Sequence, residues 1–136
     1  MSRKQSREVA FRLLFQLGFG VAVDIQGGFE LASDGVAVDE RERGYIETLV
    51  TAVAGNLEHI DKMIGETAKG FSFDRIFRVD LCALRLAVGE LLYLPDTPRV
   101  VAVNEAVHLA KKYGTDKSGG YVNGVLASIL ARVNNE

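Results

Sequence analysis

Hydrophobic residues return every three or four positions along most of this chain, and no run of strict alternation between apolar and polar residues is bounded by turn residues. The most regular stretch lies between Phe77 and Leu91, where the apolar side chains keep to one helical face. Pro95 and Pro98 end it, because proline disfavours the helical conformation in the residue before it. The pattern predicts an all-α protein.

Six to seven helices account for the periodic segments. The pattern places them at about 3–17, around 29–31, at 39–55, from 57 to an end within 65–70, at 77–91, at 101–113 and at 118–133. Turns are expected at 34–35, at 71–76 and at Gly114, which we expect to cap its helix in the left-handed conformation. No unit repeats at a fixed period, so we expect one compact single-domain helical bundle over residues 1–136.

Composition narrows the class of protein further. The 136 residues are 48% hydrophobic, enough for a domain that buries about two thirds of its unfolded surface. The single cysteine, Cys82, cannot form an intrachain disulfide and lies in an apolar helical run, so we interpret it as a small buried side chain. The first residues lack the apolar core of a secretory signal, and no window approaches the ~18 apolar residues of a membrane span. We therefore expect a cytoplasmic protein.

Two glycine-rich segments invite a nucleotide-binding interpretation, and both fail it. The segment Gly18-Phe19-Gly20 lacks the third glycine of a dinucleotide-binding loop and follows a helix, where that loop requires a strand. The segment from Gly114 to Gly119 has the glycine spacing of a phosphate loop, but Gly120 and Tyr121 stand where lysine and a hydroxyl residue are needed. We interpret it as a turn between helices.

A metal site is not expected either. Glu105 and His108 are three residues apart on one helix, which is half of the arrangement in di-iron bundles. The other half is missing, because His59, the second histidine, has Asn56 three residues before it. Since no nucleophile, base and orienting residue can be assembled from the sequence, we expect a protein that is not an enzyme and that needs no cofactor.

A local basic cluster lies at the N-terminus of a chain whose net charge is −2: Arg3, Lys4, Arg7 and Arg12 fall within about three helical turns. Because the net charge is slightly negative, any basic surface must be local. Such a cluster is an electrostatic footprint for phosphate groups. The alternative is a solvated helix face that binds nothing.

Tyr121 is the second candidate for recognition. The apolar stripe of the last helix points to the core and leaves Tyr121 on its flank, half covered, directly after a glycine-rich turn. An aromatic ring in this position can stack on an unpaired base, and Lys117 can add a phosphate contact beside it. The alternative is a tyrosine that seals the edge of the core with its hydroxyl in water.

Three separated groups of motifs give these candidates a context. They are Arg7-Glu8 with Leu14-Phe15-Gln16, then Leu84-Arg85-Leu86-Ala87 with Glu90-Leu91-Leu92, then Asn104-Glu105-Ala106, Lys111 to Gly114 and Tyr121 to Leu126. In this order and approximate spacing the chain resembles the NusB family of bacterial transcription antitermination factors. The resemblance covers nearly the whole chain, apart from about residues 19–43.

The resemblance implies an RNA-binding factor that binds single-stranded boxA RNA together with the small-subunit ribosomal protein NusE. It implies a role with RNA polymerase and other Nus factors in the transcription of ribosomal RNA operons. The residues that match RNA-binding positions, or that we place beside them, are Arg3, Lys4, Arg7, Lys117 and Tyr121. Asp74 and Asp80 match acidic positions near the partner-binding face of the family, and their charge suits a basic ribosomal protein.

Other functions remain open. The chain could be an all-α interaction or homodimerisation module with no RNA role. It could also correspond to the NusB-like RNA-binding domain of ribosomal RNA cytosine methyltransferases, although those chains continue into a catalytic domain and this one ends at Glu136. The RNA hypothesis requires that the N-terminal cations, Arg7 among them, and Tyr121 converge on one surface of the fold.

Overall fold

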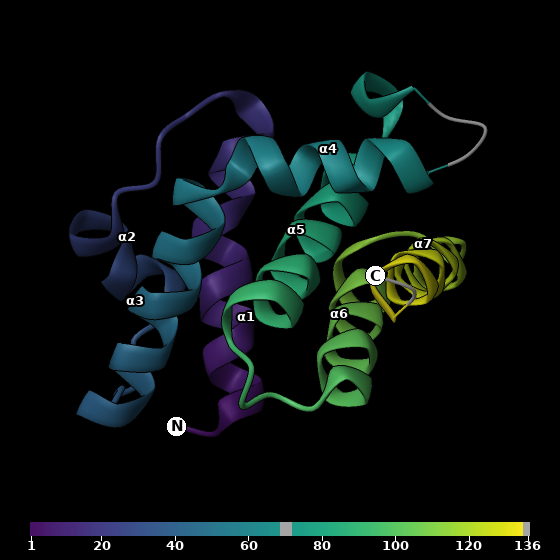
Figure 1. Cartoon of the computed structure of the whole chain (residues 1–136). Helices are drawn as coiled ribbons and strands as arrows, with labels where there is room; N and C mark the ends of the chain where they lie inside the picture. Colours follow the sequence, from purple (N-terminus) through teal and green to yellow (C-terminus); the bar gives the residue numbers. More distant parts are fainter. Residues whose placement is uncertain (69–71, 135–136) are drawn as a thin grey trace.

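The computed structural model describes residues 1–68 and 72–134, and the regular structure within these ranges is entirely helical (Figure 1). Seven α-helices and two 3₁₀ segments follow one another: α1 (Arg3–Leu14), η1 (Phe15–Phe19), α2 (Ile25–Ala32), α3 (Glu40–Gly55), α4 (Leu57–Thr67), η2 (Phe73–Arg75), α5 (Arg78–Tyr93), α6 (Arg99–Tyr113) and α7 (Ser118–Asn134). The all-α prediction is confirmed. No helix among the described residues is long and apolar enough to cross a bilayer.

Side-chain caps explain where several helices begin. Ser2 and Gln5 form a capping box at α1, in which the Ser2 hydroxyl accepts from the Gln5 N–H at 3.1 Å and the Gln5 side chain accepts from the Ser2 N–H at 2.9 Å. Asp24 caps α2 and Asp39 caps α3 in the same way, each accepting a backbone N–H three residues on. These caps set the first residues of three helices, of which the starts of α1 and α3 were predicted to within one residue.

α5 is the central helix. Every residue from Val79 to Glu90 is buried, and α1, α3, α4, α6 and α7 all pack against it. Figure 1 shows α5 running between α1 and α6, with α7 beyond α6. Gly89 allows α3 to approach closely, because a Cβ at this position would lie 2.4 Å from Cγ2 of Val53. The predicted stripe of α5 is correct apart from Phe77, which precedes the helix and is 49% exposed.

Two turn predictions have different outcomes. Asp34 and Gly35 both have positive φ, 55° and 74°, so the predicted turn is confirmed. The left-handed cap at Gly114 is wrong, since its φ is −103°. Glycine is required there for close approach: a Cβ would lie 2.3 Å from the Ser118 Oγ and 2.6 Å from the Ala110 carbonyl oxygen.

Other boundaries differ by a few residues. α1 ends at Leu14 and continues as the tighter helix η1, where one helix to residue 17 was predicted. α6 begins at Arg99, two residues before the predicted start, because the φ of −59° at Pro98 suits the position that precedes a first helical turn. Of the turn predicted at 71–76, residue 71 lies outside the described residues, as do residues 69 and 70 within the predicted end of α4.

Candidate nucleic-acid interface

Arg7 is not the solvent-facing cation that the sequence predicted. It is only 5% exposed, and its Nε and Nη2 donate to the two carboxylate oxygens of Glu90 on α5 at 2.7 and 3.1 Å. The Arg7 side chain points inward and pairs with the buried carboxylate of Glu90. Without this partner, either charge would be buried and unpaired, which is energetically costly. Arg7 is therefore a structural residue that joins α1 to the central helix.

The two cations at the start of α1 have acidic neighbours as well. Arg3 forms a bidentate pair with Glu42 of α3, at 2.8 and 3.1 Å, and lies 3.9 Å from the ring centroid of Tyr45. Lys4 is more accessible to a ligand than Arg3. Its amino group is 3.7 Å from the Glu105 carboxylate, and its side chain is 56% exposed. The N-terminal basic cluster is thus largely neutralised by carboxylates within the fold.

We expect the pair between Arg3 and Glu42 to make stability depend on acidity. The hydrogen bond from Arg3 lowers the pKa of Glu42 from 4.5 to about 2, against the opposing effect of burial and with help from the Ser6 hydroxyl at 2.8 Å. A depressed folded-state pKa stabilises the protein above the unfolded value of 4.5, and that stability is lost as the pH falls toward 2. Because Arg3 is partly exposed, the contribution is about 1 to 2 kcal/mol.

The measurement is urea unfolding of the wild type and of Glu42→Gln over a series of pH values. The stability difference should be largest near neutral pH and should vanish as the pH approaches 2. Glu47→Gln is the matched control, because Glu47 lies on the same helix in a more exposed pair with Arg43. A difference that does not vary with pH would contradict the assignment.

Glu8 organises the exposed edge between α1 and α6. It accepts from Lys112 at 2.7 Å and from Arg12 at 3.1 Å, and the Tyr113 hydroxyl donates to it. Burial acts to raise the pKa of Glu8, but these hydrogen bonds outweigh it and the pKa lies below its ordinary value. Arg12 also donates to the Ala32 carbonyl at 3.0 Å, so this arginine joins α1, α2 and α6.

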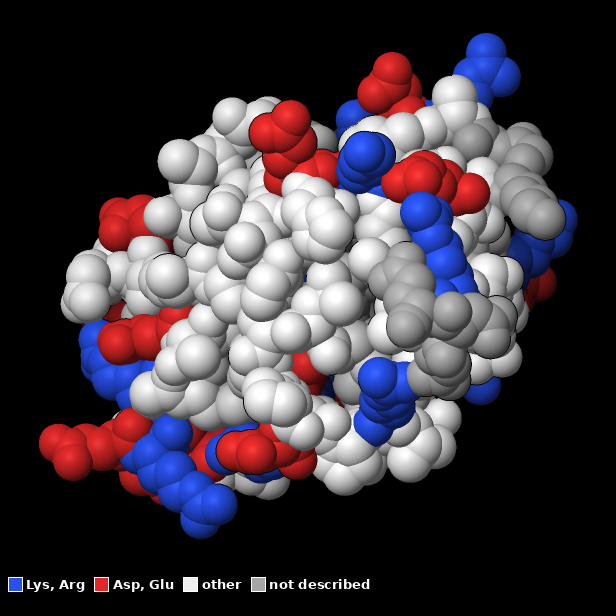
Figure 2. All heavy atoms as spheres, in the orientation of Figure 1, with Lys and Arg blue, Asp and Glu red and all other residues white. Residues whose placement is uncertain are grey.

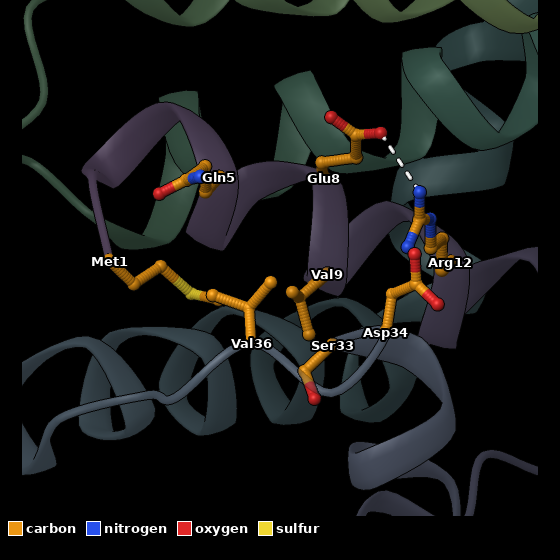
Figure 3. A pocket seen from close by; sticks show the side chains of 8 residues that line it. All are labelled: Met1, Gln5, Glu8, Val9, Arg12, Ser33, Asp34 and Val36. Atoms are coloured by element: carbon orange, nitrogen blue, oxygen red, sulfur yellow. Dashed lines mark hydrogen bonds and ion pairs between the residues drawn. The ribbon is translucent and has the colours of Figure 1, made fainter.

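Figure 3 shows Glu8 and Arg12 at one side of a small hollow of about 160 Å³ between α1 and the turn that follows α2. The Asp34 side chain points toward Arg12 in this view, and Met1 lies against Val36. No group of three or more histidine, cysteine, aspartate or glutamate residues is arranged for a metal ion within residues 1–68 and 72–134. Met1 lines the hollow at the N-terminal end of α1.

A larger cleft lies where α5 and α7 begin. It has a volume of about 410 Å³, and we call it the end cleft. Its lining residues are Arg75, Ile76, Phe77, Asp80, Thr115, Lys117 and Tyr121. Tyr121 is half-buried, as the sequence predicted, but its hydroxyl is covered and not in water, so the alternative of a tyrosine with a solvated hydroxyl is wrong. Lys117 lies beside it and is exposed, also as predicted.

Asp80 does not belong to an exposed acidic face. The residue is 7% exposed and lines the end cleft beside Tyr121, so a partner protein cannot reach it across an open surface. Burial raises the pKa of Asp80, although the nearby Ser118 hydroxyl acts in the opposite direction. Asp74, in η2, is exposed and remains available to a partner. The two acids therefore do not share the partner-binding role that the sequence suggested.

Two exposed cations, Arg75 and Lys117, line the end cleft, and Lys111 lies against Gly119 in the first turn of α7. Arg75, Lys111 and Lys117 are exposed, and no carboxylate of the described residues lies within ion-pair distance of any of them. The Lys111 side chain crosses Gly119, where a Cβ would lie 2.6 Å from its Cε. On the face that Figure 2 shows, acidic and basic residues are mixed around an uncharged centre, with no large patch of one sign.

Arg75, Phe77 and Lys111 were not predicted as site residues. Arg75 lies in the turn predicted at 71–76, Phe77 was assigned to the buried stripe of the helix that follows, and Lys111 was quoted only as part of a family motif. A signal was present, because Lys111 belongs to the same family motif as Gly114. The sequence could not show that the turn after this motif and the residues before α5 line the same cleft.

A second hollow, of about 310 Å³, lies next to the end cleft. Phe11, Arg12, Phe15, Val79 and Tyr113 line it. The two are neighbours because consecutive residues at the start of α5 line them, and because both reach the turn between α6 and α7. At this end of the bundle α1 contributes its C-terminal residues, Arg12 among them, and not Arg7, whose partner Glu90 is near the other end of α5.

These features define a class: a compact helical binding protein whose cleft combines aromatic rings with a rim of exposed cations. The NusB family model matches residues 4–131. The transcription antitermination protein NusB of Natranaerobius thermophilus is 40% identical over 98% of this chain and 98% of its own length. The chain belongs to the NusB family, and its curated relatives are transcription antitermination proteins.

Solved structures agree with this assignment. A NusB structure from T. maritima has a TM-score of 0.82 and 32% identity, covering 96% of this chain and 92% of that one. A structure of the antitermination factors NusB and NusE in complex with dsRNA has a TM-score of 0.83 and 30% identity, covering 96% of both chains. The family resemblance found in the sequence and the predicted NusB-like fold are both confirmed.

Proposed function

We propose that this protein binds single-stranded boxA RNA in the cytoplasm, together with the ribosomal protein NusE, as an antitermination factor in the transcription of ribosomal RNA operons. The observation that carries the proposal is the end cleft, where the half-buried Tyr121 lies beside the exposed Arg75 and Lys117, neither of which has an acidic partner among the described residues. Aromatic rings stack on unpaired bases and lysine or arginine contacts phosphate, so this combination suits a single strand. A relative solved with NusE and dsRNA supports RNA and NusE as the ligand and the partner.

The proposal redistributes the roles of the predicted RNA-binding residues. Tyr121 stacks on a base and Lys117 contacts phosphate, joined by Lys111. Lys4 provides a more distant phosphate contact, and Arg3 contributes less because it is engaged by Glu42. Arg7 acts only by holding α1 in place. Asp74 is kept as a contact for the basic ribosomal partner, with RNA polymerase and other Nus factors joining the complex through both components.

The experiment is a titration with boxA-like single-stranded RNA at several salt concentrations, with and without the ribosomal protein. We expect Lys117→Ala to weaken binding and to reduce the slope of log K against log salt by roughly 0.7, the value for one phosphate contact on a single strand. Lys62→Ala is the control, since Lys62 is an exposed lysine in a hollow beside the α3–α4 junction. Equal salt slopes for the wild type and Lys117→Ala would show that Lys117 does not contact a phosphate.

A duplex of the same sequence separates stacking from simple charge attraction. If a base stacks on Tyr121, the single strand should bind more tightly than the duplex, whose bases are already stacked and paired. Absence of binding to either RNA, with the ribosomal partner present, would overturn the proposed function. It would favour the alternative of a protein-interaction or homodimerisation module.

A further inference from the structure

The central helix carries three buried charged residues, and only two of them have an ionic partner among the described residues. Arg85 pairs with Asp61 at 2.8 Å, and Glu90 pairs with Arg7 at 2.7 Å. Asp80 has no such partner there: the Ser118 hydroxyl lies near its carboxyl group, but no described residue donates a hydrogen bond to its buried Oδ1. A buried acceptor left without a donor costs about 1 to 3 kcal/mol, and more for a charged group. The buried Oδ1 of Asp80 therefore does not contribute to the stability of the fold.

The surroundings of Asp80 indicate what kind of donor would suit it. Asp80 lines the end cleft together with Tyr121 and Phe77, and its Oδ1 lies buried at this position. Phe77 is 49% exposed although it is apolar, which leaves an aromatic surface at the mouth of the cleft. Arg75 and Lys117 border the same cleft, so a ligand that enters it meets an acceptor inside, flat rings beside it and positive charge at the edge.

We propose that Asp80 accepts a hydrogen bond from the exocyclic amino group of an unpaired RNA base held in the end cleft, so that the cleft favours amino-bearing bases over uracil. Cytosine N4 is a donor that aspartate and glutamate read in nucleic acids. Uracil places carbonyl oxygens on both sides of its single N–H, and these oxygens repel the carboxylate. The inference rests on the proposed function and adds to it a base preference with a named residue.

The test compares oligocytidine and oligouridine RNAs of equal length, which have the same charge and ring size and differ in the group that faces Asp80. Wild-type protein should bind oligocytidine about tenfold more tightly, as expected for one hydrogen bond to a charged acceptor. Asp80→Asn should bring the two affinities within about twofold of each other, because an amide can both donate and accept. Asp80→Ala, which removes the acceptor, should also abolish the preference.

Asp116→Asn is the matched control, because it removes the same charge from an exposed residue next to Lys117. It should strengthen the binding of both RNAs alike and leave their ratio unchanged. Thermal unfolding checks that each variant is folded, and we expect Asp80→Asn to be at least as stable as the wild type because it removes a buried charge.

The outcomes distinguish this inference from the proposed function. If the wild type binds RNA and the base preference is the same in both Asp80 variants, the inference is overturned and the proposed function stands. A preference that is also lost in Asp116→Asn, or Asp80 variants that lose only the ribosomal partner, would overturn it too. If the wild type binds neither these RNAs nor the boxA-like strand, both proposals fail.

Discussion

Replacing Arg7 with alanine is expected to destabilise the protein by about 3 to 5 kcal/mol. The substitution leaves the carboxylate of Glu90, which is 1% exposed, buried without its bidentate partner on α1. It also loosens the helix that carries Lys4, Glu8 and Arg12. Urea unfolding followed by circular dichroism measures the effect.

Arg3→Ala is the comparison, because Arg3 is on the same helix in a similar bidentate pair but its side chain is 38% exposed. We expect a loss for Arg3→Ala of no more than about 2 kcal/mol, mostly from leaving Glu42 unpaired. Similar losses for the two variants would contradict the view that burial makes the Arg7 pair special.

A double variant, Arg7→Met with Glu90→Met, separates the structural role of Arg7 from RNA binding. Replacing both partners of a buried pair by apolar residues of similar size is often neutral or stabilising, so this variant should remain folded. Its RNA affinity and salt slope should equal those of the wild type. A slope reduced by roughly 0.7 would instead mean that the Arg7 guanidinium contacts a phosphate.

Replacing Tyr121 with alanine is expected to weaken RNA binding by about 1 to 3 kcal/mol, which is roughly 5-fold to 150-fold in affinity. The loss should not change the salt dependence, because a ring removed from a stack releases no counterions. Fluorescence anisotropy with a labelled boxA-like single strand measures both quantities. Tyr121→Phe should retain most of the affinity, since it keeps the aromatic face.

Tyr93→Ala serves as the matched control, because Tyr93 is a half-buried tyrosine at the C-terminal end of α5, away from the end cleft. It should leave RNA affinity within about twofold of the wild type. Equal losses of RNA affinity for the two alanine variants would point to general destabilisation. An unchanged affinity for Tyr121→Ala would show that Tyr121 does not stack on a base.

The fold followed from periodicity because most helices bury one continuous apolar stripe and begin at recognisable caps. A short helix around Phe29 was predicted from a weak pattern, and α2 is longer, because Asp24 caps its start at Ile25. α5 was the clearest element because it is buried along its length, and its neighbours supply apolar contacts on several sides. Local rules of spacing and capping were sufficient for this part.

The site was predicted only in part, because its chemistry depends on contacts between distant segments. Helical spacing showed that Tyr121 lies on a flank, and it does. The same reasoning could not show that Arg7 meets a carboxylate 83 residues away, or that Asp80 is buried and lines the same cleft as Tyr121 of α7. A charged residue at a helix start is usually exposed, and tertiary packing overrode that expectation here.

The central claim is that RNA contacts the end of the bundle formed by the end cleft. It is tested most directly by photo-cross-linking a boxA-like single strand that carries thiouridine at successive positions, followed by mass spectrometry of the cross-linked peptides. We predict cross-links to the peptides that contain Phe77, Lys117 and Tyr121. Cross-links confined to the α3–α4 junction near Asn56 and Lys62 would contradict it.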